Sequence, residues 1–217
     1  GARVEWAGRV ANGRFLFSWA LKVNVFVASE NRNKTNEFVL SRTDISTICA
    51  YYVPTPPSCD VCHGRGLRDF YDGSAETCNV CSGRGTLSLH PGDVWVVLVR
   101  EFRSPSTSSD GFVWEFPGGS SHKPDRDPLQ TAAEELKEEL GILVDPCRFK
   151  AITNRQLAGT FSAHQAHLFA VELTFAEVNK LIRDDCANVT HGVATDTEIT
   201  YTRVRRLHEV MEKRLVD

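Results

Sequence analysis

Residues 117–142, PGGSSHKPDRDPLQTAAEELKEELGI, join a glycine turn to a run of glutamates, and this stretch decides the fold. Glu135, Glu138 and Glu139 are spaced i, i+3 and i+4, so a helix places their carboxylates on one face. Like charges at this spacing cost roughly a few tenths of a kcal/mol per pair, and a divalent cation such as Mg²⁺ reverses that cost. The stretch therefore predicts a metal-binding helix, with a solvated acidic face as the alternative.

The other side of the same helix is apolar, which indicates that the helix packs on a core. Its apolar positions are Ala132, Ala133, Leu136 and Leu140. Gly141 follows them as a helix stop, because glycine adopts the left-handed backbone angles with which helices commonly end.

Residues 135–142, ELKEELGI, carry a family resemblance. They resemble the right half of the Nudix hydrolase box, which reads Gly, five residues, Glu, seven residues, Arg-Glu-aliphatic-x-Glu-Glu-x-Gly-aliphatic. The left half departs from that box, because its arginine position holds Glu134, its upstream glutamate position holds Arg126, and its glycine lies one place early at Gly119. Since the two charges are exchanged in order, we expect Arg126 and Glu134 to form a reversed ion pair.

The resemblance implies a Mg²⁺-dependent or Mn²⁺-dependent pyrophosphohydrolase. Its implied metal ligands are Glu135, Glu138, Glu139 and the carbonyl oxygen of Gly119. Such an enzyme cleaves the pyrophosphate bond of a nucleoside diphosphate linked to another moiety, and the ions screen the phosphate oxygens while they activate water.

Three further segments look like the ADP-ribose and nucleoside-diphosphate-sugar pyrophosphatases, so an ADP-ribose-like substrate is favoured. These segments are VREFR at 99–103, WEFPGG at 114–119 and GVATDTEITYTRVRRLHEVMEK at 192–213. The subgroup implies that Arg103 holds the diphosphate, and that Trp114 and Glu115 line the strand into the site. It also implies that the loop residues Asp196 and Glu198 offer a general base. The alternatives are a surface role for Arg103 and a core role for Trp114. For Asp196 and Glu198 the alternative is that they are ordinary acidic residues of a loop.

Four cysteines predict a structural zinc site. Cys59, Cys62, Cys78 and Cys81 form two CxxC pairs with fifteen residues between them, the spacing of a four-thiolate zinc site, and disulfides are the alternative. Each pair continues as Cys-x2-Cys-x-Gly-Arg-Gly, which resembles the cysteine-rich zinc domain of DnaJ-type chaperones. Arginines 65, 68 and 84 of this module give a possible contact with RNA or protein, or they are solvated charge.

The composition is that of one ordinary globular domain with a small appendage. The chain has 217 residues, 41% of them apolar and 24% charged, with a net charge of −3 that gives no general sign of a nucleic-acid partner. We expect N-terminal strands of the Nudix domain at 1–57, the inserted zinc module at 58–88 and the main Nudix domain at 89–217. The chain has no apolar run long enough to span a membrane and no evident secretory signal, so a cytoplasmic location is expected. A homodimer is left open.

The apolar periodicity predicts an α/β/α sandwich with a mixed sheet. Two short strands are expected within 13–27, meeting near 18–21, with a turn over 28–36. Further strands are expected at 37–41, 45–53, 93–103, 111–116, 149–157, 167–173 and 199–204, and helices after the glycine turn, at 175–183 and at 207–215.

Two other functions remain open. One is an RNA 5′-end pyrophosphohydrolase of the decapping type, in which the zinc module grips the strand. The other is a catalytically silent Nudix-fold binding or scaffold protein. The loss of the box arginine supports it, and so does the sequence Ala163-His164-Gln165 where the family often has a loop carboxylate.

Overall fold

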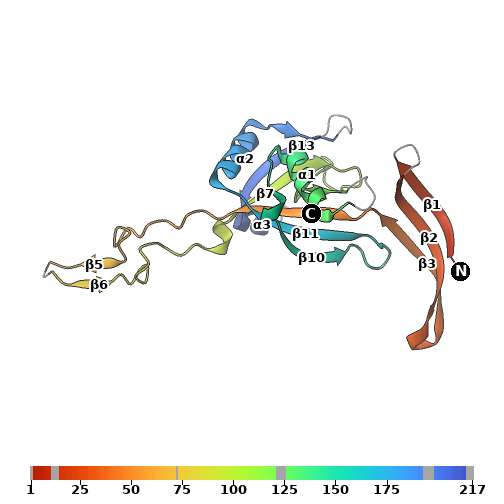
Figure 1. Cartoon of the computed structure of the whole chain (residues 1–217), viewed down its shortest axis with the longest axis horizontal. Coiled ribbons are helices and arrows are strands. Elements are labelled where there is room, and N and C mark those ends of the chain that lie inside the picture. Colours follow the sequence, from red (N-terminus) through yellow and green to blue (C-terminus); the bar gives the residue numbers. More distant parts are fainter. Residues whose placement is uncertain (1, 11–14, 72, 121–125, 193–197, 214–217) are drawn as a thin grey trace.

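The central feature is a mixed sheet flanked by helices, seen here in a computed structural model that describes residues 2–71 except 11–14, 73–120, 126–192 and 198–213 (Figure 1). The sheet has the strand order β10-β11-β4-β7-β13-β12, while β8 pairs with β7 and β9 pairs with β4. Its strands are β4 (Ile45–Tyr52), β7 (Trp95–Phe102), β8 (Phe112–Glu115), β9 (Gly118–Gly119), β10 (Lys150–Gln156), β11 (Gln165–Glu172), β12 (Thr190–His191) and β13 (Thr200–Arg206). Because β11 runs parallel to β4 and the other pairs are antiparallel, the sheet is mixed.

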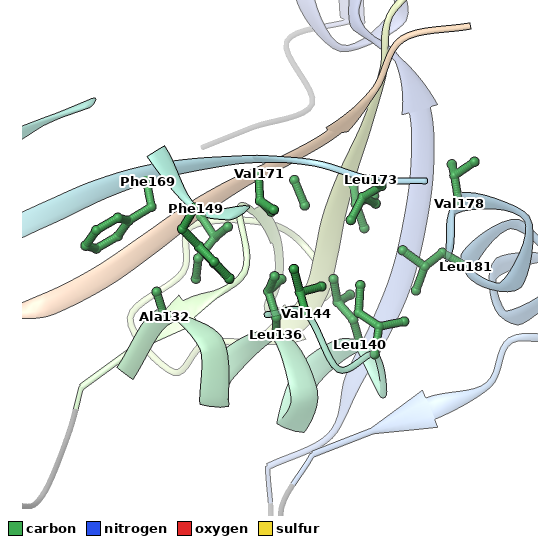
Figure 2. Packing of buried hydrophobic residues seen from close by; sticks show 14 of the residues in the cluster. Ala132, Leu136, Leu140, Val144, Phe149, Phe169, Val171, Leu173, Val178 and Leu181 are labelled. Atoms are coloured by element: carbon green, nitrogen blue, oxygen red, sulfur yellow. The ribbon is translucent and has the colours of Figure 1, made fainter. Parts of the chain in front are cut away.

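Helices cover both faces of this sheet, which confirms the expected α/β/α sandwich. On one face α1 (Pro128–Leu140) and α2 (Phe175–Ala187) pack with alternate residues of β4 and β7. Figure 2 shows Leu136 and Leu140 of α1 pointing toward the sheet beside Val171. On the other face α3 (Leu207–Lys213) places Val210 against Leu98 of β7. Because successive side chains of a strand point to opposite faces, β7 contributes Val97 and Val99 to one core and Val96 and Leu98 to the other.

The glutamate-rich helix α1 begins and ends where its capping residues stand. The Asp127 side chain accepts a hydrogen bond from the N–H of Leu129, and Pro128 occupies the first turn, where its missing N–H costs nothing. At the other end Gly141 has φ 61°, and its N–H donates to the carbonyl of Lys137. The predicted glycine stop is therefore confirmed.

The first 42 residues contain a separate sheet that the sequence did not predict. The strands β1 (Ala2–Val10), β2 (Phe15–Val27) and β3 (Arg32–Arg42) pair antiparallel, apart from the central sheet (Figure 1). The expectation of two short strands meeting near 18–21 is wrong, because β2 is continuous and Trp19 pairs with β1 on one side and β3 on the other. The expected turn over 28–36 is also too long, since it is confined to a 3₁₀ turn at Ala28–Glu30 and one further residue.

Of residues 1–57, which the sequence assigns to strands of the main domain, only β4 contributes a strand to the central sheet. The separate sheet touches the sandwich where Leu40 forms a bridge with Ser162. Large apolar side chains of this sheet face solvent, among them Trp6 and Phe26, which are 56% and 57% exposed. The first sheet therefore has apolar surface that the described residues leave uncovered.

The cysteine module extends from the sandwich as a long hairpin between β4 and β7 (Figure 1). It contains the short strands β5 (Leu67–Asp69) and β6 (Ala75–Thr77). The strands on either side of it pair with each other, since Tyr52 of β4 lies opposite Trp95 of β7.

Two more 3₁₀ turns, Pro91–Asp93 and Pro146–Arg148, lie in the connections between strands and helices. Within the described ranges, no helix is both long and apolar enough to cross a membrane.

Candidate metal and substrate site

Three carboxylates from different elements converge beside the glycine turn. Glu139 lies on α1, Glu101 near the end of β7 and Glu198 just before β13, and one oxygen of each lies within 4.8 Å of the others. Glu139 is 2% exposed and Glu101 6% exposed. Buried carboxylates this close repel one another in the low dielectric of the interior, and a bound cation removes that repulsion. The arrangement therefore has the donor chemistry of a divalent-metal site.

Glu139 is held by one hydrogen bond to its side chain and another to its backbone carbonyl. The backbone N–H of Gly118 donates to Glu139 Oε2 at 2.8 Å, and the Thr200 hydroxyl donates to the Glu139 carbonyl at 3.2 Å. Glu101 Oε2 is buried as well, and Arg103 Nη2 lies 2.9 Å from it in an ion pair that lacks hydrogen-bond geometry. A buried carboxylate needs compensation from a cation, and a metal ion can add to what Arg103 supplies.

The other two glutamates of α1 that are expected to bind metal, Glu135 and Glu138, differ in exposure. Glu135 is half-buried and lies against the turn, where a Cβ added to Gly119 would stand 2.5 Å from its Oε1. Any side chain at Gly119 would therefore displace this carboxylate. Glu138 is exposed, and its carbonyl accepts from the N–H of Gly192.

The pKa values of these carboxyls record both burial and crowding. Burial first, and then the charges of Glu138 and Glu198, raise the pKa of Glu135 to about 8. Burial and the charge of Glu135 also raise the pKa of Glu139 well above its usual value, against the N–H of Gly118. Burial raises the pKa of Glu101 to about 7 although Arg103 acts in the opposite direction. A divalent cation would favour the ionised form of all three groups.

Arg103 is held at the edge of the carboxylate cluster. Its Nη2 lies 2.5 Å from Glu115 Oε1 and 2.9 Å from Glu101 Oε2. A second guanidinium, that of Arg42 at the end of β3, donates to the hydroxyl of Ser120 at 2.9 Å, directly after Gly119. The charge of Arg103 lowers the pKa of Arg42, after the larger effect of burial. Guanidinium groups have the donor geometry that suits an anion such as phosphate.

One described residue that was expected at the site, Trp114, is not brought there. Trp114 lies on the opposite face of β8 from Glu115 and packs with Val96 and Leu98 in the core under α3. It therefore takes the core role that was its alternative. Asp196 lies outside the described residues.

Glu101 is the functional candidate that sequence reasoning missed. It stands on the strand expected at 93–103 and in the segment VREFR, where the resemblance gives a role to Arg103 alone. A carboxylate inside such an apolar strand was the available signal, because charged side chains are almost never fully buried unless they are paired. Its partners come from α1 and from the segment before β13, and a single sequence does not show that these elements meet.

A pocket of about 480 Å³ opens beside the cluster. It is lined by Glu101, Phe102, Arg103, Phe112, Glu198, Ile199 and Tyr201. Its size falls within the roughly 300–1,000 Å³ of small-molecule sites, and it combines apolar rings with a few charged groups, as such sites do.

The reversed ion pair expected from the exchanged charges is present. Arg126 Nη2 donates to Glu134 Oε1 across the junction of the turn and α1. Glu134 immediately precedes Glu135, and Arg126 immediately precedes the capping residue Asp127. The pair therefore ties the entrance of the helix to its carboxylate-bearing turn.

The four cysteines gather in the outer part of the hairpin, next to β5 and β6. All four are free and buried, with Sγ–Sγ distances of 3.8 Å for Cys59–Cys78 and 3.6 Å for Cys62–Cys81. A tetrahedral ion about 2.3 Å from each sulfur requires sulfurs about 3.8 Å apart, whereas a disulfide requires about 2.05 Å. The thiols therefore fit a zinc ion, and the disulfide alternative is not observed.

The glycines of the two Cys-x2-Cys-x-Gly-Arg-Gly repeats let the backbones of the repeats approach each other. A Cβ on Gly66 would lie 2.2 Å from the carbonyl oxygen of Gly83, and a Cβ on Gly85 would lie 2.2 Å from that of Gly64. Both contacts exclude a side chain. The N–H groups of Gly66 and Gly85 also point at Sγ atoms, at 3.3 Å from Cys62 and Cys81. The repeat thus supplies both space and hydrogen bonds to the thiols.

A sandwich that carries a glutamate-bearing helix after a glycine turn has the architecture of a Nudix domain. A comparison with protein families matches the NUDIX domain at residues 83–207, more than half of the chain, so the chain belongs to the NUDIX domain family. A search of curated proteins finds no match.

Proposed function

We propose that this protein is a Mg²⁺- or Mn²⁺-dependent hydrolase that cleaves the pyrophosphate bond of a nucleoside diphosphate linked to another moiety. The observation that carries the proposal is the convergence of Glu101, Glu139 and Glu198 within 4.8 Å beside a pocket that also contains Arg103. Buried carboxylates next to a guanidinium suit a substrate whose diphosphate is bound through metal ions.

Each group has a distinct task in this proposal. Glu101, Glu135 and Glu139 hold the ions, with the Gly119 carbonyl as a further ligand, and Glu138 adds charge from the exposed side of α1. The ions, when bound, neutralise phosphate oxygens and lower the pKa of a water molecule. Arg103 and Arg42 orient the diphosphate.

Glu198 accepts the proton of the attacking water, with Asp196 as the other candidate base. Glu198 lies close enough to Glu101 and Glu139 to receive that proton at the metal site. An ADP-ribose-like substrate is the favoured member of the class, and a structural Zn²⁺ is proposed for the four thiols.

The test is a panel of ADP-ribose, nucleotide sugars, dinucleotides and capped RNA, incubated with Mg²⁺ and resolved by chromatography. We expect a nucleoside monophosphate as one product. Glu139→Gln should lower kcat by about 100-fold or more, the scale of losing one electrostatic contact in an active site. Glu212→Gln, on the exposed side of α3, is the matched control and should leave kcat unchanged. No turnover of any substrate by the wild type would support the silent scaffold instead.

The RNA 5′-end alternative stands second because of the charges of the zinc module. Residues 58–88 contain three arginines against four carboxylates, and zinc held by four thiolates would add further negative charge. Arg65 is already paired with Asp69. A module of this charge repels a phosphate backbone, whose binding depends on basic groups.

A homodimer is the proposed assembly. The support is the uncovered apolar surface of the first sheet, with Trp6, Phe26 and Phe38 each about half exposed. Light scattering measures the mass of the protein in solution and so tests for a dimer. The double variant Trp6→Glu/Phe26→Glu should be monomeric if this sheet forms the contact.

A further inference from the structure

Half of the pocket beside the carboxylates is not explained by metal or phosphate binding. Glu101, Arg103 and Glu198 form its charged half. The rest consists of three aromatic side chains and one aliphatic side chain: Phe102, Phe112, Tyr201 and Ile199. We call Phe102, Phe112 and Tyr201 the aromatic wall.

The end of strand β7 explains why one pocket has both halves. Successive side chains on a strand point to opposite faces, so Glu101 and Phe102 belong to different sides of the sheet. Both reach the same pocket because β7 ends at Phe102, where the two faces open onto one space. A molecule bound there can contact the carboxylates with one end and the aromatic wall with the other.

The rings of the wall are held in place before any ligand binds. Phe112 lies edge-on to Phe102 at 5.9 Å and to Tyr201 at 6.2 Å between ring centroids. The guanidinium of Arg100 covers one face of the Phe112 ring at 4.1 Å from its centroid, and Asp110 holds that guanidinium at 2.5 Å. The wall is therefore rigid on the side away from the pocket.

A glycine keeps room for the outermost ring. Gly111 has φ 76°, and a Cβ placed on it would lie 2.4 Å from the Phe102 ring. Phe102 thus packs over bare backbone yet remains 57% exposed, and Ile199 across the pocket is 54% exposed. Apolar surface held open beside a charged site matches a ligand that has one planar apolar part and one anionic part.

We propose that the aromatic wall binds the base of the nucleotide substrate while Arg103 and the carboxylates bind its diphosphate. This inference rests on the proposed function and extends it, because it assigns the base to a particular part of the pocket. The wall offers rings, and every nucleobase has a π face, so binding should depend on the presence of a base more than on its identity.

The experiment measures binding of five probes to the whole protein in Mg²⁺ by titration calorimetry: ADP, GDP, UDP, CDP and inorganic pyrophosphate. Stacking of a base on an aromatic ring strengthens binding by about 5- to 150-fold. The wild type should therefore prefer all four nucleoside diphosphates to pyrophosphate by a factor in this range. Differences among the four bases should be smaller than that factor.

Ring-removing variants locate the effect. Phe102→Leu and Tyr201→Leu should each reduce the preference for nucleoside diphosphates and leave pyrophosphate affinity unchanged. Tyr201→Phe retains the ring and should retain the preference. Phe175→Leu removes an exposed ring at the start of α2, outside the pocket, and should change neither affinity. Thermal melting of each variant checks that the fold is intact.

The outcomes separate this inference from the proposed function. If the leucine variants lose pyrophosphate affinity to the same extent, or if the wild type does not prefer nucleoside diphosphates, the wall does not bind the base. If the wild type hydrolyses ADP-ribose and both leucine variants keep its KM, the proposed hydrolase stands, but the aromatic wall does not bind the base. A wild type that shows the ring-dependent preference but hydrolyses nothing supports the wall and refutes the hydrolase.

Discussion

Exchanging the charges of Arg126 and Glu134 tests whether their ion pair positions the metal-binding helix. The Arg126 side chain is 15% exposed and that of Glu134 is 49% exposed, so the pair lies at the boundary between interior and solvent. Opposite charges about 3 Å apart attract by about 1.5 to 5 kcal/mol at effective dielectric constants of roughly 80 to 20. Desolvation and side-chain ordering offset most of this, which leaves about 1 kcal/mol of net stabilisation.

Each single change replaces an attraction by a repulsion at the entrance of α1. Arg126→Glu places two carboxylates together, and Glu134→Arg places two guanidinium groups together. Because Glu135 follows directly in the chain, either repulsion shifts its carboxylate relative to Gly119. A displacement of about 1 Å in an active site can cost about 100-fold in rate, so we expect each single variant to lose about 10- to 100-fold in kcat. The double variant, which restores the charge order of the Nudix box, should recover most of it.

The assay is kcat for ADP-ribose at saturating Mg²⁺, with the free energy of unfolding measured in parallel. A double-mutant cycle then gives the coupling between the two positions, expected at about 1 kcal/mol or more in stability and larger in activity. The matched control exchanges Arg65 and Asp69, an exposed i,i+4 pair in the cysteine hairpin, and should leave kcat unchanged. Additive losses in the double variant would show that the pair does not position the helix.

Three further outcomes are expected. Glu138→Gln should lower kcat at saturating Mg²⁺ without changing the melting temperature, because its side chain is exposed, and wild-type turnover would remove it from the metal site. One Zn²⁺ should co-purify, and Cys59→Ser should expose residues 58–88 to proteolysis while the sandwich stays folded; a metal-free preparation with the same hairpin protection contradicts this. Glu177→Gln should lower the free energy of unfolding by about 1 kcal/mol at pH 7, because Arg148 and then Thr174 lower the pKa of Glu177 to about 2. Since this folded-state pKa lies below the ordinary glutamate value of 4.5, the difference between the two proteins is complete above about pH 4.5 and is lost as the pH falls toward 2. A difference that persists unchanged at pH 2.5 contradicts the assignment.

Helix α1 was predictable because its determinants are local. Its apolar stripe, its glycine stop and the spacing of its glutamates all lie within one short segment, and the structure keeps each of them. The burial of Glu139 was not predictable. Its contacts come from Gly118 and Thr200, which are distant in the chain and close in the fold.

The first sheet shows a different limit. The partial alternation of residues 13–27 predicts two short strands that meet near 18–21. In the structure Ser18 pairs with Gly8 on one side and Arg42 on the other, so ladders on both edges keep the strand continuous. Strand propensity depends on the neighbours that a strand acquires, and a sequence does not display them.

The base of the cysteine hairpin has a kinetic consequence for the sandwich. Tyr52 and Trp95 must pair across a connection of about 40 residues, and closing a loop costs entropy that grows with the logarithm of its length. When Ser58 and Thr86 are bridged and the thiols hold an ion, the unpaired connection falls to about a dozen residues. The shorter loop lowers the closure cost by about 1 kcal/mol. A chain that acquires its ion early should therefore bring β4 and β7 together about fivefold faster than one that folds without it.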